Sequence, residues 1–492
     1  MRWASGPLEI ARRGKADGFS LPNKQTLERY HEPASLDILK NSPIDCLVLS
    51  WAAGLPEDAV QQKSAAPLIA AARERNLAVV GWVEEAADPQ AAIAAARSAG
   101  LAAVAIQNFK GQTDFPVIPW GDRAKMPWDA PGAILAASDN VWPGVSMPGN
   151  GASAGPTGAP WLDSNGWFLQ MARARVSQPL WLMFDPPGKG RIFTAADYQT
   201  AVCDAEITGG RWVISLDESV RSGLIVDNPA AREILDRVGA AIRFFDKHAD
   251  WRTFRSLGVL GVVSDFTGDN FDMSGEILNG AARRNLQFRA IWKSQAVAQP
   301  FTGLKALMYA DKEAPEAALR KKMMDFAERG GLLIAGPKWG PEGTPTDPGF
   351  DTQFAVRTYG KGRLAVAKDE LVDAFQVSAD AQFLVSHAND LVKVYNAASV
   401  GCTLVVGSPD SKRELVQVLE FAAGWSGGPR TVWVRKRYRG AARLWSIGRS
   451  IGGSIGAAEP MRIEPGPADE YFGQECRIPP EVPGYFALEF EV

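Results

Sequence analysis

Cysteine and histidine are scarce in this sequence, with four and three residues among 492. The cysteines lie far apart, form no C-x-x-C pair and stand at Cys46, Cys203, Cys402 and Cys476. The histidines are equally scattered, so the sequence argues against a disulfide framework and against a Cys/His zinc site. We therefore expect no bound metal.

Long apolar runs are also missing. No window approaches the roughly 18–20 apolar residues that a membrane-spanning helix requires. The first residues, MRWASGPLEIARRG, lack the apolar segment of a signal peptide, which favours a cytoplasmic protein. A secreted protein whose signal had been removed would look the same.

Charge of one sign is not in excess, because the formal net charge is only −3. This balance gives no electrostatic reason to expect nucleic acid or an anionic membrane as a partner. Hydrophobic residues make up 46% and charged residues 22%, which is ordinary for a globular protein. A chain of this length predicts two or three domains.

The first half of the chain alternates short β-branched or apolar runs with Ala-rich helical segments. Strand, helix and strand at this spacing predict parallel pairing through right-handed crossovers. We therefore predict a (β/α)₈ TIM-type barrel over residues 1–250, with one or two further strands in the first 44 residues. The strands expected from the pattern span 45–51, 77–85, 101–109, 133–140, 179–185 and 211–218.

The rest of the chain changes pattern twice. Residues 251–397 form a compact β-α-β-β-α-β series, which predicts a doubly wound domain of the flavodoxin or amidotransferase type. Residues 398–492 contain short alternating runs between Gly/Pro turns, which predict a small antiparallel β-sandwich. No cysteine lies between Cys203 and Cys402, so the middle domain lacks a cysteine nucleophile. We expect it to be non-catalytic and to mediate homo-oligomer assembly.

This order of domains resembles that of glycoside hydrolase family 42 β-galactosidases and related carbohydrate enzymes. The hairpin YGKGRLAV and the closing run VQVLEFAAG…PRTVWVRKRYRGAARLWS carry the resemblance, together with the architecture. It implies a glycosidase with an oligosaccharide or glycoside substrate. Those galactosidases have an Asn-Glu pair after the fourth strand, where this chain has Asn108 and Phe109. No catalytic residue is therefore carried over from the family.

Carboxylates gather at the ends of the expected barrel strands, where the chemistry of such barrels takes place. Glycoside hydrolysis requires one carboxylic acid to protonate the leaving oxygen and a second carboxylate to attack or to activate water. Strand alternation directs Asp217 and Asp185 inward, so they are the first candidates, and Glu218 and Asp139 follow. Each of these residues has an alternative role as a cap of the next helix.

Aromatic and polar side chains between these carboxylates are candidates for holding a sugar. The stretch GAPWLDSNGWFLQMAR, residues 158–173, follows a Gly/Pro-rich loop and fits either a sugar-binding rim or ordinary packing at the start of a helix. The loop after residue 185 adds two basic residues that suit an acidic sugar or a solvated turn. The candidates for substrate binding are Trp51, Glu84, Asn108, Trp142, Trp161, Asp163, Asn165, Trp167, Lys189 and Arg191.

Other chemistries fit less well. The two GKG triplets do not follow the G-x-G-x-x-G pattern, so we expect no dinucleotide cofactor. The loop VSDFTGDNFD lacks the central Gly and the closing Glu of a calcium loop, and it is better explained as the start of a helix. Two functions remain open: a glycoside hydrolase, and a non-catalytic carbohydrate-binding or scaffold protein on a degenerate barrel.

Overall fold

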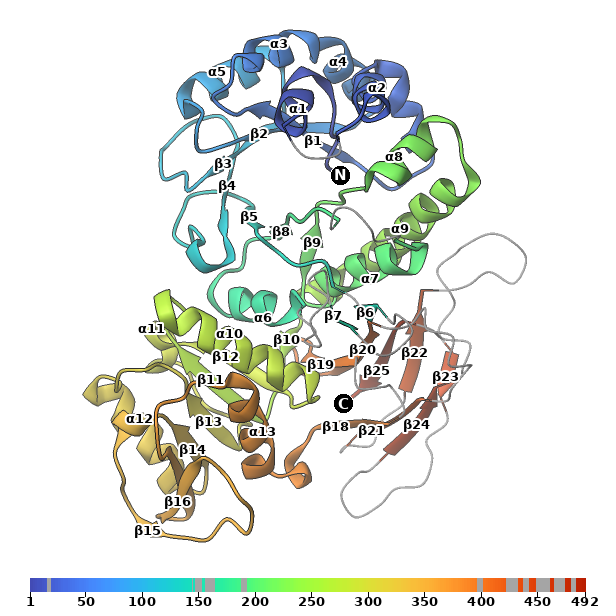
Figure 1. Cartoon of the computed structure of the whole chain (residues 1–492). Coiled ribbons are helices and arrows are strands. Elements are labelled where there is room, and N and C mark those ends of the chain that lie inside the picture. The colour runs from blue at the N-terminus through green and yellow to red at the C-terminus, as the bar shows by residue number, and fades with distance from the viewer. Residues whose placement is uncertain are drawn as a thin grey trace.

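A computed structural model shows three parts packed against one another (Figure 1). A curved parallel sheet, a doubly wound sheet and an antiparallel sandwich follow in chain order, which confirms the predicted fold class. The structure describes residues 1–15, 19–143, 145–146, 153–154, 164–186, 193–395, 401–421, 432–436, 442–447, 461–463, 474–478 and 484–492.

Seven parallel strands form the curved sheet, in the order β1-β2-β3-β4-β5-β8-β9. They run around an arc, with helices on the outer side (Figure 1). A separate two-stranded hairpin joins β6 (Val145–Ser146) to β7 (Ser153–Ala154). The strands of the curved sheet are β1 (Cys46–Ala52), β2 (Ala78–Val83), β3 (Ala103–Gln107), β4 (Val117–Asp122), β5 (Leu135–Ser138), β8 (Leu180–Leu182) and β9 (Gly210–Trp212).

The first three residues close this sheet into a barrel. The N–H of Trp3 donates to the carbonyl of Val48 and the N–H of Val48 donates to the carbonyl of Met1, both at 2.8 Å. On its other side, the N–H of Arg2 donates to the carbonyl of Ile214 at 2.8 Å, just beyond β9. The N-terminal segment therefore lies between the two edges of the sheet and acts as the eighth strand.

All six strands expected in the barrel are present, and the further strand expected near the N-terminus is residues 1–3. The sequence prediction missed β4. Pro116 and Pro119 interrupt its apolar run, and proline is normally a sign against a strand. No α-helix separates β3 from β4 or β4 from β5, a region that the structure describes throughout. The usual strand-helix alternation that reveals such a barrel is therefore absent there.

The barrel helices pack apolar residues against the outer face of the strands. Asp88 caps α5 through the backbone N–H groups of Gln90 and Ala91, and Gly100 ends that helix in the left-handed conformation. The helices of this part are α1 (Gly6–Arg13), α2 (Leu21–Tyr30), α3 (Glu57–Ser64), α4 (Ala66–Glu74), α5 (Pro89–Ala99), α6 (Gly166–Arg175), α7 (Ala195–Glu206), α8 (Glu218–Ile225) and α9 (Pro229–Lys247).

The middle part is a doubly wound sheet with the order β12-β11-β13-β14-β17-β16-β15. Helices α10 (Gly268–Arg283) and α13 (Ala374–Val385) pack on one face, and α12 (Ala317–Glu328) packs on the other. The short helix α11 (Lys293–Ala296) follows β12. The strands are β11 (Leu260–Ser264), β12 (Phe288–Trp292), β13 (Ala306–Tyr309), β14 (Leu332–Ala335), β15 (Thr344–Pro345), β16 (Phe354–Tyr359) and β17 (Gly362–Ala367).

The C-terminal part is a sandwich of two antiparallel sheets. One has the order β10-β19-β20-β25-β22-β23 and the other β18-β21-β24. Strands β10 and β18 come from residues that the sequence assigns to the middle domain, so the boundaries 251–397 and 398–492 stay a prediction. The strands are β10 (Arg255–Ser256), β18 (Val392–Tyr395), β19 (Gly401–Gly407), β20 (Arg413–Glu420), β21 (Val432–Lys436), β22 (Ala442–Ser446), β23 (Met461–Ile463), β24 (Gln474–Ile478) and β25 (Tyr485–Glu491).

Helix α6 joins the barrel to the middle part. The indole N–H of Trp292, at the end of β12, donates to the carbonyl of Met171 on α6 at 2.8 Å.

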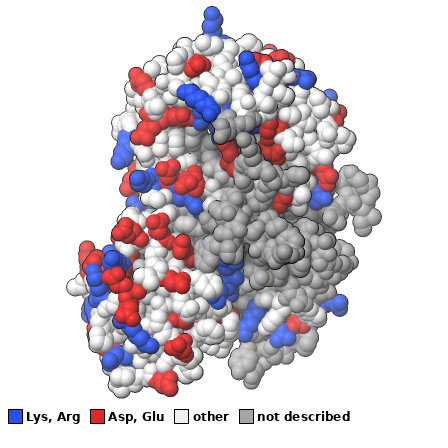
Figure 2. Space-filling model, viewed as in Figure 1, with Lys and Arg blue, Asp and Glu red and all other residues white. Residues whose placement is uncertain are grey.

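On the visible face, acidic and basic side chains are interspersed over the described residues (Figure 2). Among the helices that the structure describes, none is both long and apolar enough to cross a membrane.

Candidate active site

A pocket of about 260 Å³ opens at the carboxyl ends of the barrel strands. Side chains from the N-terminal strand, from α1, from β2, from the end of β5 and from the segments after β5, β8 and β9 line it. Most of the side chains in its lining are polar or charged, and the apolar ones are Trp82, Met183, Phe184 and Val213. This is the end of the barrel at which active sites of this fold are built.

Asp185 is the best-supported carboxylate of this pocket. Its Oδ1 accepts a hydrogen bond from the Ser215 hydroxyl, and its Oδ2 accepts one from Nη1 of Arg2 at 2.9 Å. Half of the Asp185 side chain (50%) is exposed, so a ligand can reach it. Partial burial favours the neutral acid, but Arg2 and the Ser215 hydroxyl outweigh it and hold the pKa of Asp185 below its usual value. Asp185 is therefore a carboxylate at neutral pH.

Glu9 is a buried carboxylate that binds the arginines beside this pocket, which we call the mouth pocket. Its side chain is 1% exposed and accepts hydrogen bonds from Nη1 of Arg12 at 3.1 Å, from Nε of Arg13 and from the Ser50 hydroxyl at 2.7 Å. Nη2 of Arg2 lies 3.8 Å from its Oε1. Burial favours the neutral acid, but the guanidinium groups outweigh it and hold the pKa of Glu9 well below its usual value.

Glu84 lies next to this cluster because it forms an ion pair with Arg12. Arg12 lines the pocket and its other contacts go to Glu9 and to the Ser50 hydroxyl. Glu84 therefore orients an arginine of the pocket.

Asp139 and Asn140 border the pocket after β5. Asp139 is exposed, has a left-handed φ of 56°, and its carboxylate has no hydrogen bond or ion pair among the described residues. Nδ2 of Asn140 donates to the carbonyls of Ala137 at 2.6 Å and of Met183 at 3.3 Å, which ties the β5 end to the β8 end. The Asn140 Oδ1 is buried and unpaired within the described part of the chain.

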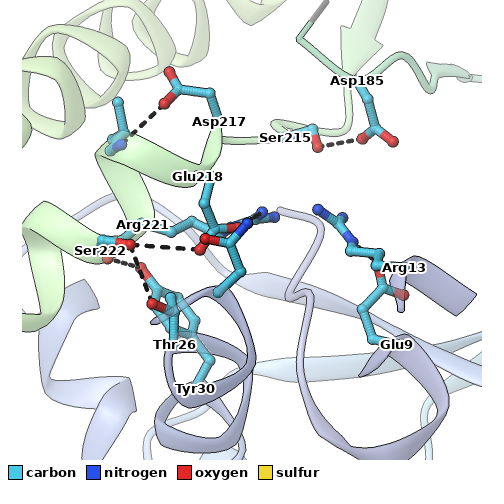
Figure 3. Close-up of polar contacts among 12 residues, drawn as sticks. Glu9, Arg13, Thr26, Tyr30, Asp185, Ser215, Asp217, Glu218, Arg221 and Ser222 are labelled. Atoms are coloured by element: carbon cyan, nitrogen blue, oxygen red, sulfur yellow. Dashed lines mark hydrogen bonds and ion pairs between the residues drawn. The ribbon is translucent and has the colours of Figure 1, made fainter. Parts of the chain in front are cut away.

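Asp217 does not face the pocket, which corrects the inward direction that strand alternation predicts. It is the N-cap of α8, where its Oδ1 accepts from the N–H of Val220 at 3.0 Å. Its Oδ2 accepts from the Tyr198 hydroxyl at 2.8 Å, and that hydroxyl accepts from the Asp217 N–H at 2.9 Å. β9 already ends at Trp212, so the alternation does not extend to this residue. Figure 3 shows Asp217 pointing away from Asp185.

Glu218 belongs to the first turn of α8. Its carboxylate accepts from Nη2 of Arg221 at 2.6 Å and from the Ser222 hydroxyl at 3.4 Å. These contacts turn it toward α8 and α2 rather than toward Asp185 (Figure 3). Of the four candidate catalytic residues, the structure therefore brings together Asp185 and Asp139 only.

The predicted tryptophan platforms are mostly core residues. Trp51 is fully buried and its indole N–H donates to the carbonyl of Ala92 on α5 at 3.2 Å. Trp142 is 2% exposed and lies within aromatic contact of Phe184, Phe193, Tyr198 and Trp212. Neither presents a ring face to the pocket.

The stretch at residues 158–173 is a packed helix start over its described part. Trp167 is 6% exposed and its ring contacts Phe271 of the middle part, with the Arg123 guanidinium 5.4 Å from the ring centroid. Asn165 is fully buried. Its Oδ1 accepts from the N–H of Val141, and its Nδ2 donates to the Val141 carbonyl and to Asp204.

The remaining predicted binding residues divide into two groups. Asn108 is exposed at the end of β3 with a left-handed φ of 50°, and it does not line the pocket. Four others lie outside the described residues: Trp161, Asp163, Lys189 and Arg191.

Arg2 and Arg12 are pocket residues that the sequence interpretation missed. Arg2 lies in the N-terminal strand, which at three residues is too short for a periodic pattern to reveal, and Arg12 lies in α1, ahead of the first expected strand. Trp82 of β2 also lines the pocket, and it stacks on Trp120 with ring centroids 4.4 Å apart. Within the described residues, no cluster of three or more His, Cys, Asp or Glu side chains fits a metal ion.

Comparison with solved structures places the fold among glycoside hydrolases. The chain is similar to α-L-fucosidase isoenzyme 2 from Paenibacillus thiaminolyticus, with a TM-score of 0.58, 10% identity, and coverage of 94% of this chain and 96% of that one. An exo-carrageenase of family GH42 from Bacteroides ovatus gives a TM-score of 0.42 at 10% identity, covering 77% of this chain and 52% of that one. A β-galactosidase from Bacillus circulans sp. alkalophilus gives 0.37 at 11% identity, covering 99% and 88%.

No known protein family matches the sequence, and no curated protein matches it either. The predicted resemblance to glycoside hydrolases is confirmed in architecture. The chain is a TIM-barrel protein that carries a doubly wound part and a β-sandwich.

Proposed function

We propose that this protein is a glycosidase whose reaction takes place at the carboxyl end of the barrel. The observation that carries the proposal is Asp185, an ionised and half-exposed carboxylate that Arg2 and Ser215 orient at the mouth. The fold that it shares with an α-L-fucosidase supports the proposal, because the similarity covers 94% of this chain and 96% of that one.

The contacts of Asp185 favour one role for it and leave the other role to Asp139. Arg2 stabilises the ionised form of Asp185, which suits a nucleophile or a base and not a proton donor. Asp139 is the other carboxylate that lines the pocket, so it is the candidate for the acid that protonates the leaving oxygen. A retaining enzyme requires the carboxyl groups to be about 5–5.5 Å apart and an inverting one about 6.5–9.5 Å.

The pocket suits a single sugar unit, which fits cleavage from the end of a chain. Its volume of about 260 Å³ is below the ~300–1,000 Å³ that is usual for sites of drug-sized ligands. The indole of Trp82 offers an apolar face, while Ser138, Asn140 and Arg12 offer polar groups for sugar hydroxyls. The buried, unpaired Oδ1 of Asn140 would accept a hydrogen bond from one of them.

Non-catalytic sugar binding on a degenerate barrel is the second candidate. The observation in its favour is Phe109, which is buried where the family that the chain resembles has a glutamate. In that case the pocket binds sugars but hydrolyses none.

Hydrolysis of a panel of aryl glycosides, including α-L-fucosides and β-galactosides, separates the two candidates. We expect the wild type to hydrolyse at least one of them and Asp185→Asn and Asp139→Asn to be impaired. The Asp217→Asn variant is the matched control, because Asp217 is a strand-end carboxylate outside the pocket. Sugar binding by calorimetry without turnover on any substrate would support the second candidate instead.

Assembly through the middle part remains a prediction of its own. Helix α13 and the residues before it expose Val372, Phe375 and Phe383, which are apolar. Exposed apolar side chains of this kind are common at interfaces. Sedimentation at micromolar concentration should show an oligomer, and a strict monomer would contradict this prediction without affecting the barrel.

A further inference from the structure

The opposite end of the barrel contains a second and larger cavity of about 990 Å³. It lies among the amino ends of the strands, below the side chains of the mouth. Inward-facing residues of β1, β2, β3 and β4 line it, together with Trp181 of β8 and Val213 beyond β9. Trp82 and Met183 line the mouth pocket but not this cavity, whereas Val213 lines both. About one layer of side chains therefore separates the two.

Small side chains leave this space open. The interior of such barrels is normally filled by three layers of bulky residues. Here the stacked indoles of Trp82 and Trp120 and the side chain of Met183 fill the upper part. The lower positions carry Cys46, Val48, Val80 and Ala103, which are too short to meet across the barrel.

Trp181 gives the cavity an aromatic wall. It alternates with Leu180 and Leu182, which are buried on the outer side of β8, so its indole faces inward. Trp181 is only half-buried, although it lies inside the barrel, because the cavity leaves its ring exposed. A flat indole face is a good surface for stacking another ring.

The charges near the cavity are mostly engaged with one another. Glu206 pairs with Arg252 at 3.1 Å, and Arg211 pairs with Asp246 at 2.7 Å. Two carboxylates of the lining, Asp45 and Asp114, are exposed at the rim, and Asp114 pairs with Arg97. A charged ligand would lose its hydration without gaining a partner inside, whereas an apolar ligand would gain from burial.

We propose that this cavity binds an uncharged, largely apolar small molecule that contains an aromatic ring, with the ring against Trp181 and the apolar body among Val48, Val80 and Ala103. The site is independent of the proposed glycosidase reaction, because none of these residues lines the mouth pocket. Its volume lies in the ~300–1,000 Å³ range that is usual for small-molecule sites.

Two measurements on the full-length protein test the proposal. N-phenyl-1-naphthylamine, an uncharged aromatic probe, should bind with an increase in its fluorescence. Xenon under pressure, which enters apolar cavities, should appear in crystals beside Trp181 and Ala103.

A pair of substitutions on one strand provides the matched control. Ala103→Leu fills the cavity, so we expect probe binding to weaken at least ~10-fold while the melting temperature is kept. Ala105 faces the same side of β3 two residues further on, but it is fully buried and outside the cavity lining. Ala105→Leu should therefore lower the melting temperature and leave the probe affinity of the folded protein unchanged.

A third variant addresses the ring itself. Trp181→Leu should weaken binding of the aromatic probe more than it weakens binding of cyclohexane, which is measured by competition with the probe. Probe affinity that is the same in the wild type, in Ala103→Leu and in Trp181→Leu would overturn the proposal, as would a cavity that takes up no xenon.

Discussion

The segments that follow β8 and β9 are alike in sequence and different in structure. Each strand leads into an apolar run that ends in an aspartate, at Asp185 and at Asp217. α8 begins immediately after Asp217, whereas α7 begins only at Ala195. A carboxylate directly before a helix satisfies the free N–H groups of its first turn, and one that stands apart from a helix remains available for other partners.

The contacts of the two residues differ as well. Asp217 contacts a tyrosine hydroxyl and a backbone N–H, while Asp185 contacts a guanidinium that is itself anchored by buried Glu9. Distance from the next helix and the nearest cation therefore distinguish the capping carboxylate from the one that lines the pocket more reliably than strand alternation does.

Replacement of Glu9 should have the largest effect, because it removes the anion on which the arginines of the mouth converge. For Glu9→Gln we expect the free energy of unfolding to fall by about 3–5 kcal/mol, the usual cost of breaking a buried ion pair. Chemical denaturation at pH 7 measures this change. Glu28→Gln is the control, since Glu28 is exposed and 3.8 Å from Lys24, and its effect should stay within about 0.5 kcal/mol.

The pH dependence of stability provides a second test of Glu9, because it shows whether the buried side chain is ionised. The pKa of Glu9 is depressed in the folded protein, so its stabilisation is present above the ordinary value of 4.5 and is lost as the pH falls. The difference between the wild type and Glu9→Gln should therefore narrow on acidification below about pH 4.5. A difference that stays constant down to pH 3 would contradict the buried anion.

The activities of Asp185→Asn and Asp217→Asn form the next test. Turnover of the best substrate should fall at least ~10²-fold in Asp185→Asn, the scale expected of a catalytic carboxylate. Asp217→Asn should keep most of its turnover because its side chain caps α8. Both variants should retain the wild-type circular dichroism spectrum, and equal losses in the two would contradict the distinction between them.

Much of the fold could be predicted from sequence periodicity. Six barrel strands and the doubly wound order follow from apolar runs separated by helical segments. Strand β4 could not be found, because Pro119 lies inside it and no helix sets it apart. The N-terminal strand was too short for a periodic signal, and only its backbone hydrogen bonds to Val48 and Ile214 reveal it.

The site was less predictable, because it depends on which side chain finds a partner. Asp185 and Asp139 were expected at the strand ends and do line the pocket. Trp142 and Trp167 have the same residue type and position as sugar platforms, but the aromatic side chains around them make them core residues. Contacts between residues that are distant in sequence, such as Arg2 with Asp185, leave no local pattern.

Replacement of Arg2 should have a smaller effect than the substitutions above, namely a shift in the pKa of Asp185. Arg2→Met removes the cation that holds the carboxylate ionised, so the pKa of Asp185 should rise toward its usual value. Carbon-13 NMR of the labelled aspartates measures this pKa without any substrate. In an active enzyme the acidic limb of the kcat/KM profile should move to higher pH, by up to about one unit.

Arg2→Lys is the matched variant for this measurement. It keeps the charge and loses the flat guanidinium that reaches both Asp185 and Glu9, so its effect should lie between those of the wild type and Arg2→Met. An Asp185 pKa that is unchanged in Arg2→Met would show that the Ser215 hydroxyl alone holds the carboxylate.

The smallest effect is expected from the cap of α8. Asp217→Ala leaves the N–H of Val220 and the Tyr198 hydroxyl without their partner, which should lower the free energy of unfolding by about 0.5–2 kcal/mol. Asp217→Ser should recover most of this loss, because a serine side chain also accepts from the first turn of a helix. Thermal denaturation of the three proteins measures the difference, and Tyr198→Phe reports how much of it belongs to the tyrosine. If Asp217→Ala left stability unchanged but abolished turnover, Asp217 would be a residue of the site, and the cap would not explain its position.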